Sequence, residues 1–363
     1  SFATPEFLFA KLMERFDVPP DSSEAANLTL IQLRVGNVLQ RWISNYGDDF
    51  NKELAKKRDV FIDKLQQNEN KAIAKLYPTL KNAIIKMEKE ADPTSIIRKF
   101  GEPAPDPKVN FRFVFSPKLN ILEDVDEEEI ARQLCLIEFK LYTKIKATEL
   151  LNQAWSKPKL KHRAMNILKM IARFNSVSMW VATSILMAPK IKQRAKILSK
   201  CIKIAEHLHS LNNFNGTMAI IAGLNWSSVH RLRWTRKEIG PKLLQTVDDL
   251  ERVLSSDNSF KTYRAKIASV NPPCIPYLGV YLTDLTFIDE NPDMINGLIN
   301  FAKRRMIHGV ISKVQQYQDT YYNLHEIDQV AYQLLRVTNL DEQTLYNLSL
   351  KREPRGAERN EIE

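Results

Sequence analysis

The chain has 363 residues, a formal net charge of +10, and 44% hydrophobic and 26% charged residues. Such a composition is ordinary for a globular protein and excludes disordered, collagen-like and disulfide-stapled classes. The length suits two domains of roughly 150 residues, or one large domain with an accessory piece. Because only 10 glycines occur while helix-forming residues fill long stretches, the sequence predicts an all-α fold.

The first region, residues 1–91, predicts a small helical domain. Its apolar residues recur at the spacing of amphipathic helices, and they include Phe9, Leu12, Phe16, Val35, Leu39 and Trp42. The Pro/Ser-rich stretch at 18–23 predicts a loop between the first two helices. Since the sequence opens on an already apolar segment, we expect the start of this domain to be truncated.

Residues 92–125 differ in composition and predict a linker. Five prolines fall too close together for a long helix, at positions 93, 103, 105, 107 and 117. Phenylalanines alternate with other residues over 111–115, which predicts a short extended piece. We therefore expect a packed linker, not a loose one.

The largest region, residues 126–356, predicts a helical domain of many helices, followed by a tail at 357–363. Asp126 is a plausible N-cap, and the three glutamates that follow it suit the positive end of a helix. Loop signals then interrupt the helical pattern at several proline- and asparagine-containing stretches. The absence of a repeat of fixed period argues against a solenoid.

No motif for conventional active-site chemistry is present. The sequence contains neither a phosphate-binding glycine loop nor the HExxH and GxSxG patterns. The three cysteines, Cys135, Cys201 and Cys274, are far apart and form no CxxC pair. The sequence therefore predicts no cofactor, no metal site and no covalent catalysis, and it indicates a reducing, cytosolic compartment.

The positive charge is concentrated in basic runs at 157–163, 190–203 and 303–305. These runs could meet nucleic acid or, as a lesser alternative, anionic lipid headgroups. Without a nucleic-acid motif, their spacing favours solvated helix faces, and we expect no nucleic-acid partner. For the third run we expect the buried side of the helix to come from Leu298, Ile299, Ala302 and Met306.

Five segments of the large region carry a resemblance. They are IARFNSVSMWVA (171–182), LNNFNG (211–216), NPPCIPYLGVYLTDLTFIDENP (271–292), NFAKRR (300–305) and LYNLSLKREPR (345–355). In this order and spacing, they resemble the catalytic domain of the Ras guanine-nucleotide exchange factors. The front region, with QLRVGNVLQRWI at 32–43 and DDF at 48–50, is similar to the N-terminal Ras exchanger motif of that family.

The resemblance implies an all-helical catalytic domain with a protruding helical hairpin, preceded by the smaller helical domain. It implies a cytoplasmic, monomeric exchange factor that is recruited to membranes where its partner is anchored. That partner would be a Ras- or Rap-type small GTPase, bound most tightly when free of nucleotide. The hairpin would open the nucleotide site and promote GDP release and GTP loading without making or breaking a covalent bond.

The segment 277–290 also has a helical pattern of its own. One stripe is apolar and is expected to pack inward, and it contains Leu278, Tyr281, Leu282, Leu285 and Ile288. The other is small and polar and ends in a carboxylate, and it contains Gly279, Thr283, Thr286 and Glu290. By periodicity alone, an ordinary amphipathic helix with a solvated side is favoured over a wedge, and it is the family resemblance that favours the wedge.

By the resemblance, Thr286 obstructs the magnesium position of the GTPase, and Glu290 lies near the nucleotide phosphates. A carboxylate there repels phosphate oxygens and offers another acceptor to the groups that held them. This sequence lacks the glycine that is common between Glu290 and Asn291. Asp289 could therefore share or take the carboxylate role, so the expected catalytic set is Thr286, Asp289, Glu290 and Asn291.

The resemblance also implies a GTPase-binding surface outside these positions. The expected contacts are Thr283, Met218, Ala222, Asn225, His230, Phe174 and Asn175. Met218, Ala222 and Asn225 share one face of a helix, although Met218 and Ala222 could equally belong to the core. His230 stands where the family often has tyrosine. We further expect the front domain, through Trp42, to brace the base of the hairpin.

Two alternatives stay open from the sequence. A relative of the same fold could bind a GTPase as a catalytically inactive scaffold, and the region of Thr286 and Glu290 distinguishes this case. An all-helical nucleic-acid binder would explain the charge of +10, and it predicts binding that weakens steeply with salt.

Overall fold

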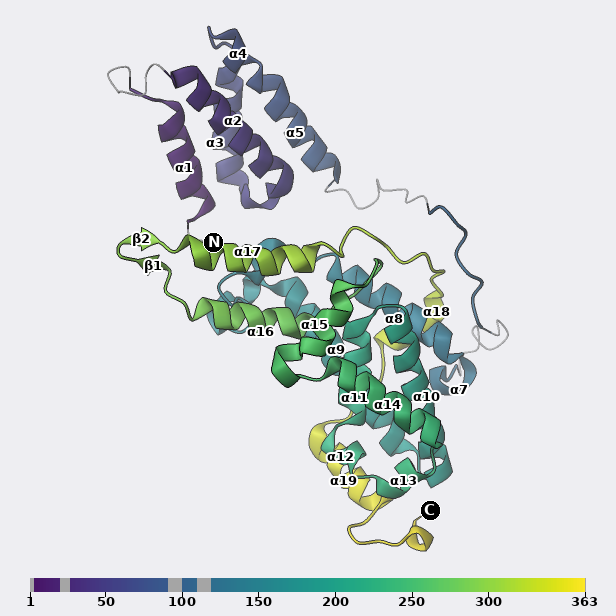
Figure 1. Cartoon of the computed structure of the whole chain (residues 1–363). Helices are drawn as coiled ribbons and strands as arrows, with labels where there is room; N and C mark the ends of the chain where they lie inside the picture. Colours follow the sequence, from purple (N-terminus) through teal and green to yellow (C-terminus); the bar gives the residue numbers. More distant parts are fainter. Residues whose placement is uncertain (1–2, 20–26, 91–99, 110–118, 363) are drawn as a thin grey trace. The chain divides into compact units, whose positions relative to one another are not determined.

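The structure is a computed structural model that describes residues 3–19, 27–90, 100–109 and 119–362. The chain divides into two compact units, residues 1–101 and 102–363. Both are helical, and the only strands within the described ranges are two pairs of residues (Figure 1). The all-α prediction is confirmed. The predicted extended piece at 111–115 lies outside the described residues, and the domain limits around the linker stay a prediction.

Unit 1, residues 1–101, is a bundle of amphipathic helices around its own apolar core. Its helices are α1 (Pro5–Phe16), α2 (Leu28–Asn45), α3 (Lys52–Leu65), α4 (Lys71–Ala74) and α5 (Leu76–Glu90), with the 3₁₀ turn η2 (Gly47–Asp49). Trp42 belongs to this core and is 7% exposed. Its indole nitrogen donates to Asp49 Oδ2 at 2.8 Å, and its ring lies 4.7 Å from the ring of Phe50.

Unit 2, residues 102–363, is built around four helices that pack on one another. These are α8 (Glu127–Tyr142), α9 (Met165–Met187), α10 (Ile191–Ser210) and α11 (Phe214–Leu224). Around them lie α7 (Ile121–Asp124), η3 (Ala147–Leu150), η4 (Pro158–Arg163), α12 (Ser227–His230), α13 (Arg233–Lys237), α14 (Pro241–Leu254), α15 (Asp257–Ala268), α18 (Asp328–Leu335), α19 (Glu342–Arg352) and η5 (Arg359–Glu361). As predicted, Asp126 caps α8 by accepting a hydrogen bond from the Glu128 amide at 2.9 Å.

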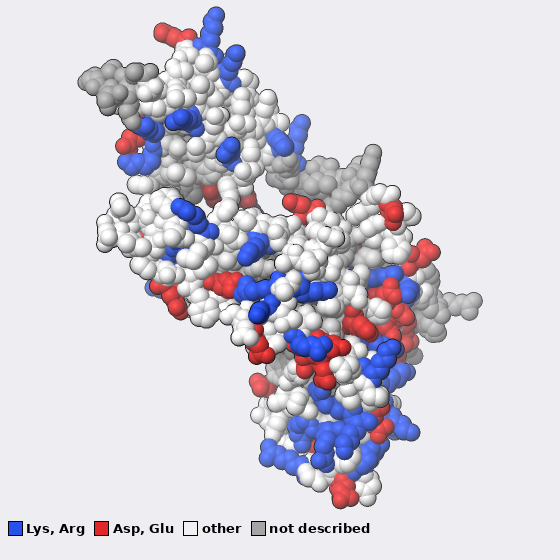
Figure 2. Space-filling view, viewed as in Figure 1, with Lys and Arg blue, Asp and Glu red and all other residues white. Residues whose placement is uncertain are grey.

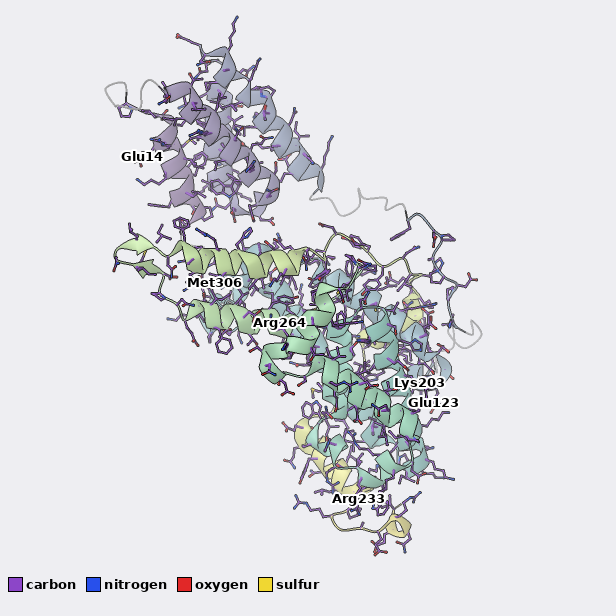
Figure 3. All side chains as sticks on the ribbon, in the orientation of Figure 1. Glu14, Glu123, Lys203, Arg233, Arg264 and Met306 are labelled. Carbon is purple, nitrogen blue, oxygen red and sulfur yellow. The ribbon has the colours of Figure 1, made fainter. Side chains whose placement is uncertain are left out.

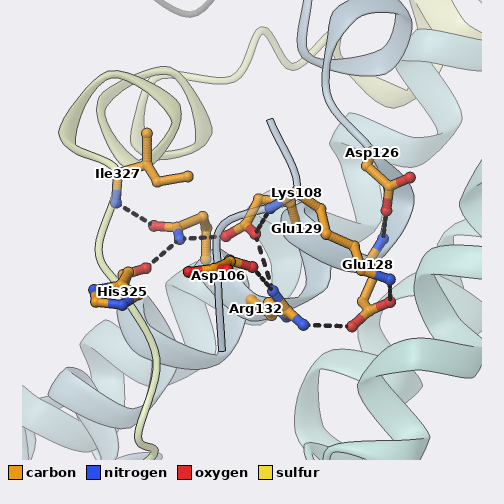
Figure 4. A network of polar contacts seen from close by, with 9 residues as sticks. Asp106, Lys108, Asp126, Glu128, Glu129, Arg132, His325 and Ile327 are labelled. Carbon is orange, nitrogen blue, oxygen red and sulfur yellow. Dashed lines mark hydrogen bonds and ion pairs between the residues drawn. The ribbon is translucent and has the colours of Figure 1, made fainter. Parts of the chain in front are cut away.

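A buried polar network at the start of α8 fastens the first segment of unit 2 to the helical body (Figure 4). Glu129, which is 1% exposed, accepts from the Lys108 amide at 2.9 Å and from Gln133 Nε2 at 2.8 Å. Arg132 lies 3.4 Å from the same carboxylate. The side-chain amide of Gln133 also makes two hydrogen bonds to the backbone of the segment 325–327. Its nitrogen donates to the carbonyl of residue 325, and its oxygen accepts from the amide of residue 327. The network therefore joins two irregular segments to one helix, and the buried carboxylate has partners for its lone pairs.

The most prominent feature of unit 2 is a helical hairpin. Helices α16 (Leu278–Asp289) and α17 (Phe301–Gln315) lie side by side and extend from the body of the unit (Figure 1). A small antiparallel ribbon, β1 (Met294–Ile295) and β2 (Leu298–Ile299), joins them at the far end. Asn296 and Gly297 form its turn with φ of 50° and 75°. Asn-Gly is the residue pair that this left-handed turn favours.

The predicted burial of α17 is wrong. Lys303, expected in solvent, is 3% exposed, whereas Met306 and Leu298, expected to be buried, are 45% and 73% exposed. The predicted apolar stripe ran through residues 298 and 299, which form the ribbon and not the helix. Counted from the true start at Phe301, the buried stripe is Lys303, Ile307, Val310, Ile311 and Val314.

Arg194, also expected in a solvated basic run, is fully buried. Its guanidinium donates to the carbonyls of Ala188 and Pro189, and to the Thr235 hydroxyl at 3.2 Å. It therefore joins the loop before α10 to α13. A long cation whose donors meet backbone carbonyls can be buried, and sequence spacing does not reveal those partners.

All three cysteines are buried and unpaired. Burial raises the pKa of the Cys201 and Cys274 thiols to about 12, and it raises the pKa of Cys135 as well. No described helix is long and apolar enough to cross a bilayer. No group of histidine, cysteine and carboxylate side chains within the described ranges is placed to hold a metal ion.

Candidate functional site

Helix α16 has the two faces that its spacing predicts. Leu278, Tyr281, Leu282 and Leu285 are buried, and Ile288 is half-buried against the core. On the opposite side Thr283 and Glu290 are exposed, while Gly279 and Thr286 are half-buried. One side of the helix thus holds the hairpin on unit 2, and the other leaves small and polar groups available to a partner.

Phe287 was not anticipated from the sequence. Its side chain is 62% exposed, and it follows Thr283 by four residues and precedes Glu290 by three. These intervals place all three side chains on one helix face. An exposed aromatic ring beside a carboxylate is typical of contact surfaces. The same helical spacing identifies Phe287 if the contact face is taken to include exposed apolar residues as well as polar ones.

The polar groups near the end of α16 are satisfied by the helix itself. The Thr286 hydroxyl donates to the carbonyl of Leu282 at 2.9 Å, and the Asn291 side-chain amide donates to the carbonyl of Ile288 at 3.0 Å. The second of these bonds satisfies a carbonyl in the last turn of the helix. Thr286 and Asn291 are therefore fixed in place before any partner binds.

The two candidate carboxylates are in different environments. The Asp289 side chain is 16% exposed, accepts from Gln153 Nε2 at 3.3 Å and lies 3.9 Å from Lys303 Nζ. Glu290 is exposed, and its side chain has no hydrogen-bond or ion-pair partner in the described part of the chain. Asp289 is thus held within the hairpin, whereas Glu290 is available to a partner.

Lys303 fixes the backbone that carries these carboxylates. From α17 its ammonium donates to the carbonyls of Asp289 at 3.0 Å and Asn291 at 2.7 Å. It also pairs with Asp293 Oδ1 at 2.8 Å, and this contact lowers the pKa of the Asp293 carboxyl. A cation at the carbonyl end of a helix is favourable. Its position in a basic run gave no sign of this role.

The base of the hairpin is held differently. Arg264 of α15, which is labelled in Figure 3, makes two bonds to the Asp284 carboxylate, at 2.9 and 2.7 Å. The Tyr277 amide donates to the hydroxyl of Tyr263 at 2.8 Å. A bidentate ion pair fixes orientation as well as distance. The first turns of α16 are therefore tied to α15 by side chains that have little freedom.

The predicted contact face of α11 lies at the surface. Met218 and Ala222 are the two residues of this helix that are not buried, although both remain half-covered. Asn225, just past the helix, is exposed, and its amide donates to Glu251 Oε1 at 2.7 Å. These three positions form a partly exposed stripe on a helix whose other sides are in the core.

This stripe is connected to the hairpin through the backbone. The Phe214 amide donates to the carbonyl of Ile275 at 2.9 Å, and the Ile275 amide donates to the carbonyl of Asn212 at 3.0 Å. The start of α11 therefore lies against the segment that leads into α16. Glu138, fully buried on α8, accepts from the side chain of Asn213 at 3.1 Å, and burial raises its pKa.

The remaining predicted contacts lie on α9 and α12. Phe174 is half-buried, with its ring 5.8 Å from that of Tyr277, immediately before α16. Asn175 and His230 are exposed. The structure thus connects Phe174 to the hairpin base and joins the α11 stripe to the same base. Trp42 belongs to the core of the other unit.

Comparison with known proteins supplies the context for this geometry. Residues 129–305 match the RasGEF domain, and residues 1–67 match the RasGEF N-terminal motif. From Dictyostelium discoideum, Ras guanine nucleotide exchange factor J is 48% identical over 369 residues, covering 100% of this chain and 45% of that protein. Exchange factor A of the same organism is 47% identical, covering 100% of this chain and 61% of the relative. Exchange factor S is 37% identical over 98% of this chain and 35% of its own length. The chain thus spans about half the length of the curated relatives it matches.

Proposed function

Because this chain belongs to the family of Ras guanine nucleotide exchange factors, we propose that it binds a Ras- or Rap-type small GTPase and accelerates release of its GDP. The observation that carries the proposal is the end of α16. There the exposed carboxylate of Glu290 follows the polar face of the helix, and Lys303 holds the backbone on either side of Glu290 by hydrogen bonds. No covalent step is required, so the chain acts as an exchange catalyst.

The exposed face of α16 supplies the wedge. Thr283, Thr286 and Phe287 meet the GTPase beside its nucleotide, Thr286 obstructs the magnesium position, and Glu290 faces the phosphates. Negative charge at that point repels the phosphate oxygens and competes for the groups that bind them. Asp289 and Asn291 support this arrangement by fixing the turn that follows the helix.

The stripe on α11 supplies the second contact. Met218 and Ala222 present apolar surface, and Asn225 and His230 present polar groups beside it. Phe174 and Asn175 extend this surface toward the hairpin base. Since α11 and the segment before α16 are hydrogen-bonded to each other, a GTPase that contacts the stripe is held at a defined position relative to the wedge.

Turnover follows from linkage. If the chain binds the nucleotide-free GTPase most tightly, nucleotide must weaken its binding by the same factor. Incoming GTP therefore displaces the exchange factor, and the cellular ratio of GTP to GDP sets the direction. The chain acts as a monomer, in the cytoplasm, at membranes where the GTPase is anchored.

We further propose that unit 1 braces the base of the hairpin, because a hairpin free to swing would lose binding free energy on being ordered. Trp42 supports this role through the fold of unit 1, since its side chain is in that core. We expect Trp42→Ala to unfold unit 1 and to slow GDP release, whereas the exposed neighbour Val38→Ala leaves the rate unchanged. An unchanged rate with unit 1 unfolded, seen by hydrogen exchange, would reject the brace.

The central test is release of fluorescent GDP from a panel of Ras and Rap proteins. The variant D289K/E290K should lose the acceleration by at least about tenfold, since both carboxylates at the wedge are reversed. The matched variant D248K/D319K changes the net charge equally at exposed positions outside the site, and it should retain full activity.

The same assay separates a catalyst from a scaffold. If the unaltered chain captures a GTPase in a pull-down but releases GDP no faster than the GTPase alone, the inactive scaffold is the correct function. If salt-dependent binding to DNA or RNA is found with no GTPase capture, the nucleic-acid alternative holds.

A further inference from the structure

One end of unit 2 carries a concentration of positive charge that the exchange site does not use. Figure 2 shows it over the part of unit 2 that carries α13, α19 and the C-terminus, and Figure 3 places Arg233 there. We define this basic pole by its exposed cations, Lys190, Lys192, Lys196, Arg233, Lys237 and Arg355. None of these six makes an ion pair within the described ranges.

Hydrogen bonds hold the elements of the pole together. Arg194 joins the loop before α10 to Thr235 of α13, and Arg352 of α19 donates to the carbonyls of Leu186 at 2.9 Å and Met187 at 3.1 Å. The buried Glu353 accepts from the amides of residues 234 and 235. The ends of α9, α10, α13 and α19 therefore form one rigid surface.

The acidic groups near this surface do not cancel its charge. Glu353 is 3% exposed and faces inward onto α13. Glu238 is paired with Arg359 at 2.7 Å, and the two remaining exposed carboxylates of the described C-terminal segment, Glu358 and Glu361, are fewer than the six cations. The pole therefore has a net positive electrostatic potential at its solvent-facing surface.

Apolar groups lie among these cations. Met187, the last residue of α9, is 54% exposed, and its carbonyl is bonded by Arg352. The half-buried ring of Trp234 lies under two cations, with Arg233 Cζ at 4.7 Å and Lys237 Nζ at 4.4 Å from the ring. Cations around an exposed thioether and an indole are suited to a bilayer interface, where headgroups meet acyl chains.

From these observations we propose that the basic pole docks on an anionic phospholipid surface, with Met187 entering the interface. This deepens the membrane recruitment within the proposed function by assigning it to a specific surface. Charge complementarity favours anionic lipid, and the exposed apolar group favours a lipid surface over the purely polar backbone of a nucleic acid.

Met187 and the lysines before and within α10 lie away from the hairpin, and of the six cations only Arg233, three residues after His230, is near a proposed GTPase contact in sequence. Phe174 and Met187 are thirteen residues apart on α9, which is about 20 Å along a helix axis. A lipid surface at the pole would therefore leave the hairpin and the α11 stripe free. Docking and exchange can be measured independently for this reason.

The test uses the full 363-residue chain and sedimentation with vesicles of phosphatidylcholine, either pure or with roughly one third phosphatidylserine, at about 0.15 M salt. The unaltered chain should bind the anionic vesicles and not the neutral ones. The variant K190Q/K192Q/K237Q should bind about a hundredfold more weakly, at about fivefold for each cation removed.

The control variant is K157Q/K159Q/K161Q. These lysines are exposed on and beside η4, at the opposite end of α9 from Met187, and their substitution removes the same charge. We expect this control variant to weaken vesicle binding by less than about threefold, because its three positions lie farther from the pole than the Debye length. Equal losses in the two variants would overturn the proposal, because attraction would then follow net charge alone.

A third variant, Met187→Ser, separates lipid from other anions. It should weaken binding to anionic vesicles several-fold through the lost apolar contact. If it has no effect there, or if the unaltered chain binds duplex RNA but not the vesicles, the proposal is wrong. GDP release from a GTPase in solution should be unchanged in all three variants, so failure of docking is distinguishable from failure of exchange.

Discussion

The base and the tip of the hairpin are held by different forces. At the base, Leu278, Tyr281, Leu282 and Leu285 of α16 are each less than 9% exposed. At the tip, Met294, Ile295 and Leu298 are at least 50% exposed, and the backbone is fixed by the polar contacts of Lys303. The base therefore depends on apolar burial, whereas the tip depends on one buried cation.

This difference separates stability from function. Burial at the base contributes to the stability of unit 2, because it is continuous with the main core. The contacts of Lys303 are local to the turn that carries Glu290, so their loss should alter the site more than the fold. Variants at the two ends can test this separation.

The largest effect on stability is expected at the base. Leu285 is 2% exposed, and Leu285→Ala should lower the free energy of unfolding by about 2–5 kcal/mol. The matched variant Leu298→Ala removes the same atoms at the tip, where the side chain is 73% exposed. It should change the free energy of unfolding by less than about 0.5 kcal/mol. Denaturant titration measures both, and equal losses would refute the comparison.

The next effect is at the tip. Lys303→Met leaves the carbonyls of Asp289 and Asn291 without their donor, at a cost of about 1–3 kcal/mol, while the Asp293 carboxylate keeps its pair with Arg304 at 2.7 Å. Because the lost bonds are confined to the turn, we expect GDP release to slow by about tenfold or more, while the melting temperature of unit 2 falls by less than in the Leu285 variant. Lys313→Met, at an exposed position of the same helix, is the control and should leave both quantities unchanged.

A smaller effect is expected for the ion pair at the base. The side chains of Arg264 and Asp284 are 35% and 28% exposed, so Arg264→Ala should lower the free energy of unfolding by at most about 1 kcal/mol. Arg252→Ala, which removes a more exposed pair with Asp249, should have no measurable effect. If the Arg264 variant slows exchange by more than the Lys303 variant, the tip is not the controlling end.

The smallest change in stability is expected at Phe287, since its ring is 62% exposed. Phe287→Ala should leave the unfolding curve unchanged but weaken capture of the nucleotide-free GTPase several-fold through lost apolar contact. Tyr332→Ala, at another exposed aromatic residue, provides the comparison. Identical GTPase binding in the two variants would remove Phe287 from the contact surface.

The fold could be predicted from the sequence where apolar residues repeat with a single period. The stripe of Leu278, Tyr281 and Leu285 is such a case, because burial against one core imposes that period. On α17 the same reasoning failed, since the stripe was extended through residues that form a ribbon. The Asn296-Gly297 pair, which favours a tight turn between two strands, is the local signal that ends the helical pattern there.

The site was harder to predict, because its geometry depends on contacts between distant segments. The face of α16 with Thr283 and Glu290 was found by spacing, and the structure places both side chains in solvent. That Asp289 is held while Glu290 is available depends on Gln153 and Lys303. Neither partner is a neighbour in sequence, so local pattern carries no information about them.

The burial of the three thiols has a practical consequence for experiments on this chain. Because their pKa values are raised far above neutrality, these thiols are protonated and shielded, and maleimide reagents should leave them unmodified in the native state. A cysteine introduced at position 298 would then accept a fluorophore selectively. Distance changes between the labelled ribbon and a bound GTPase could be followed in real time during nucleotide exchange, without first removing any natural cysteine.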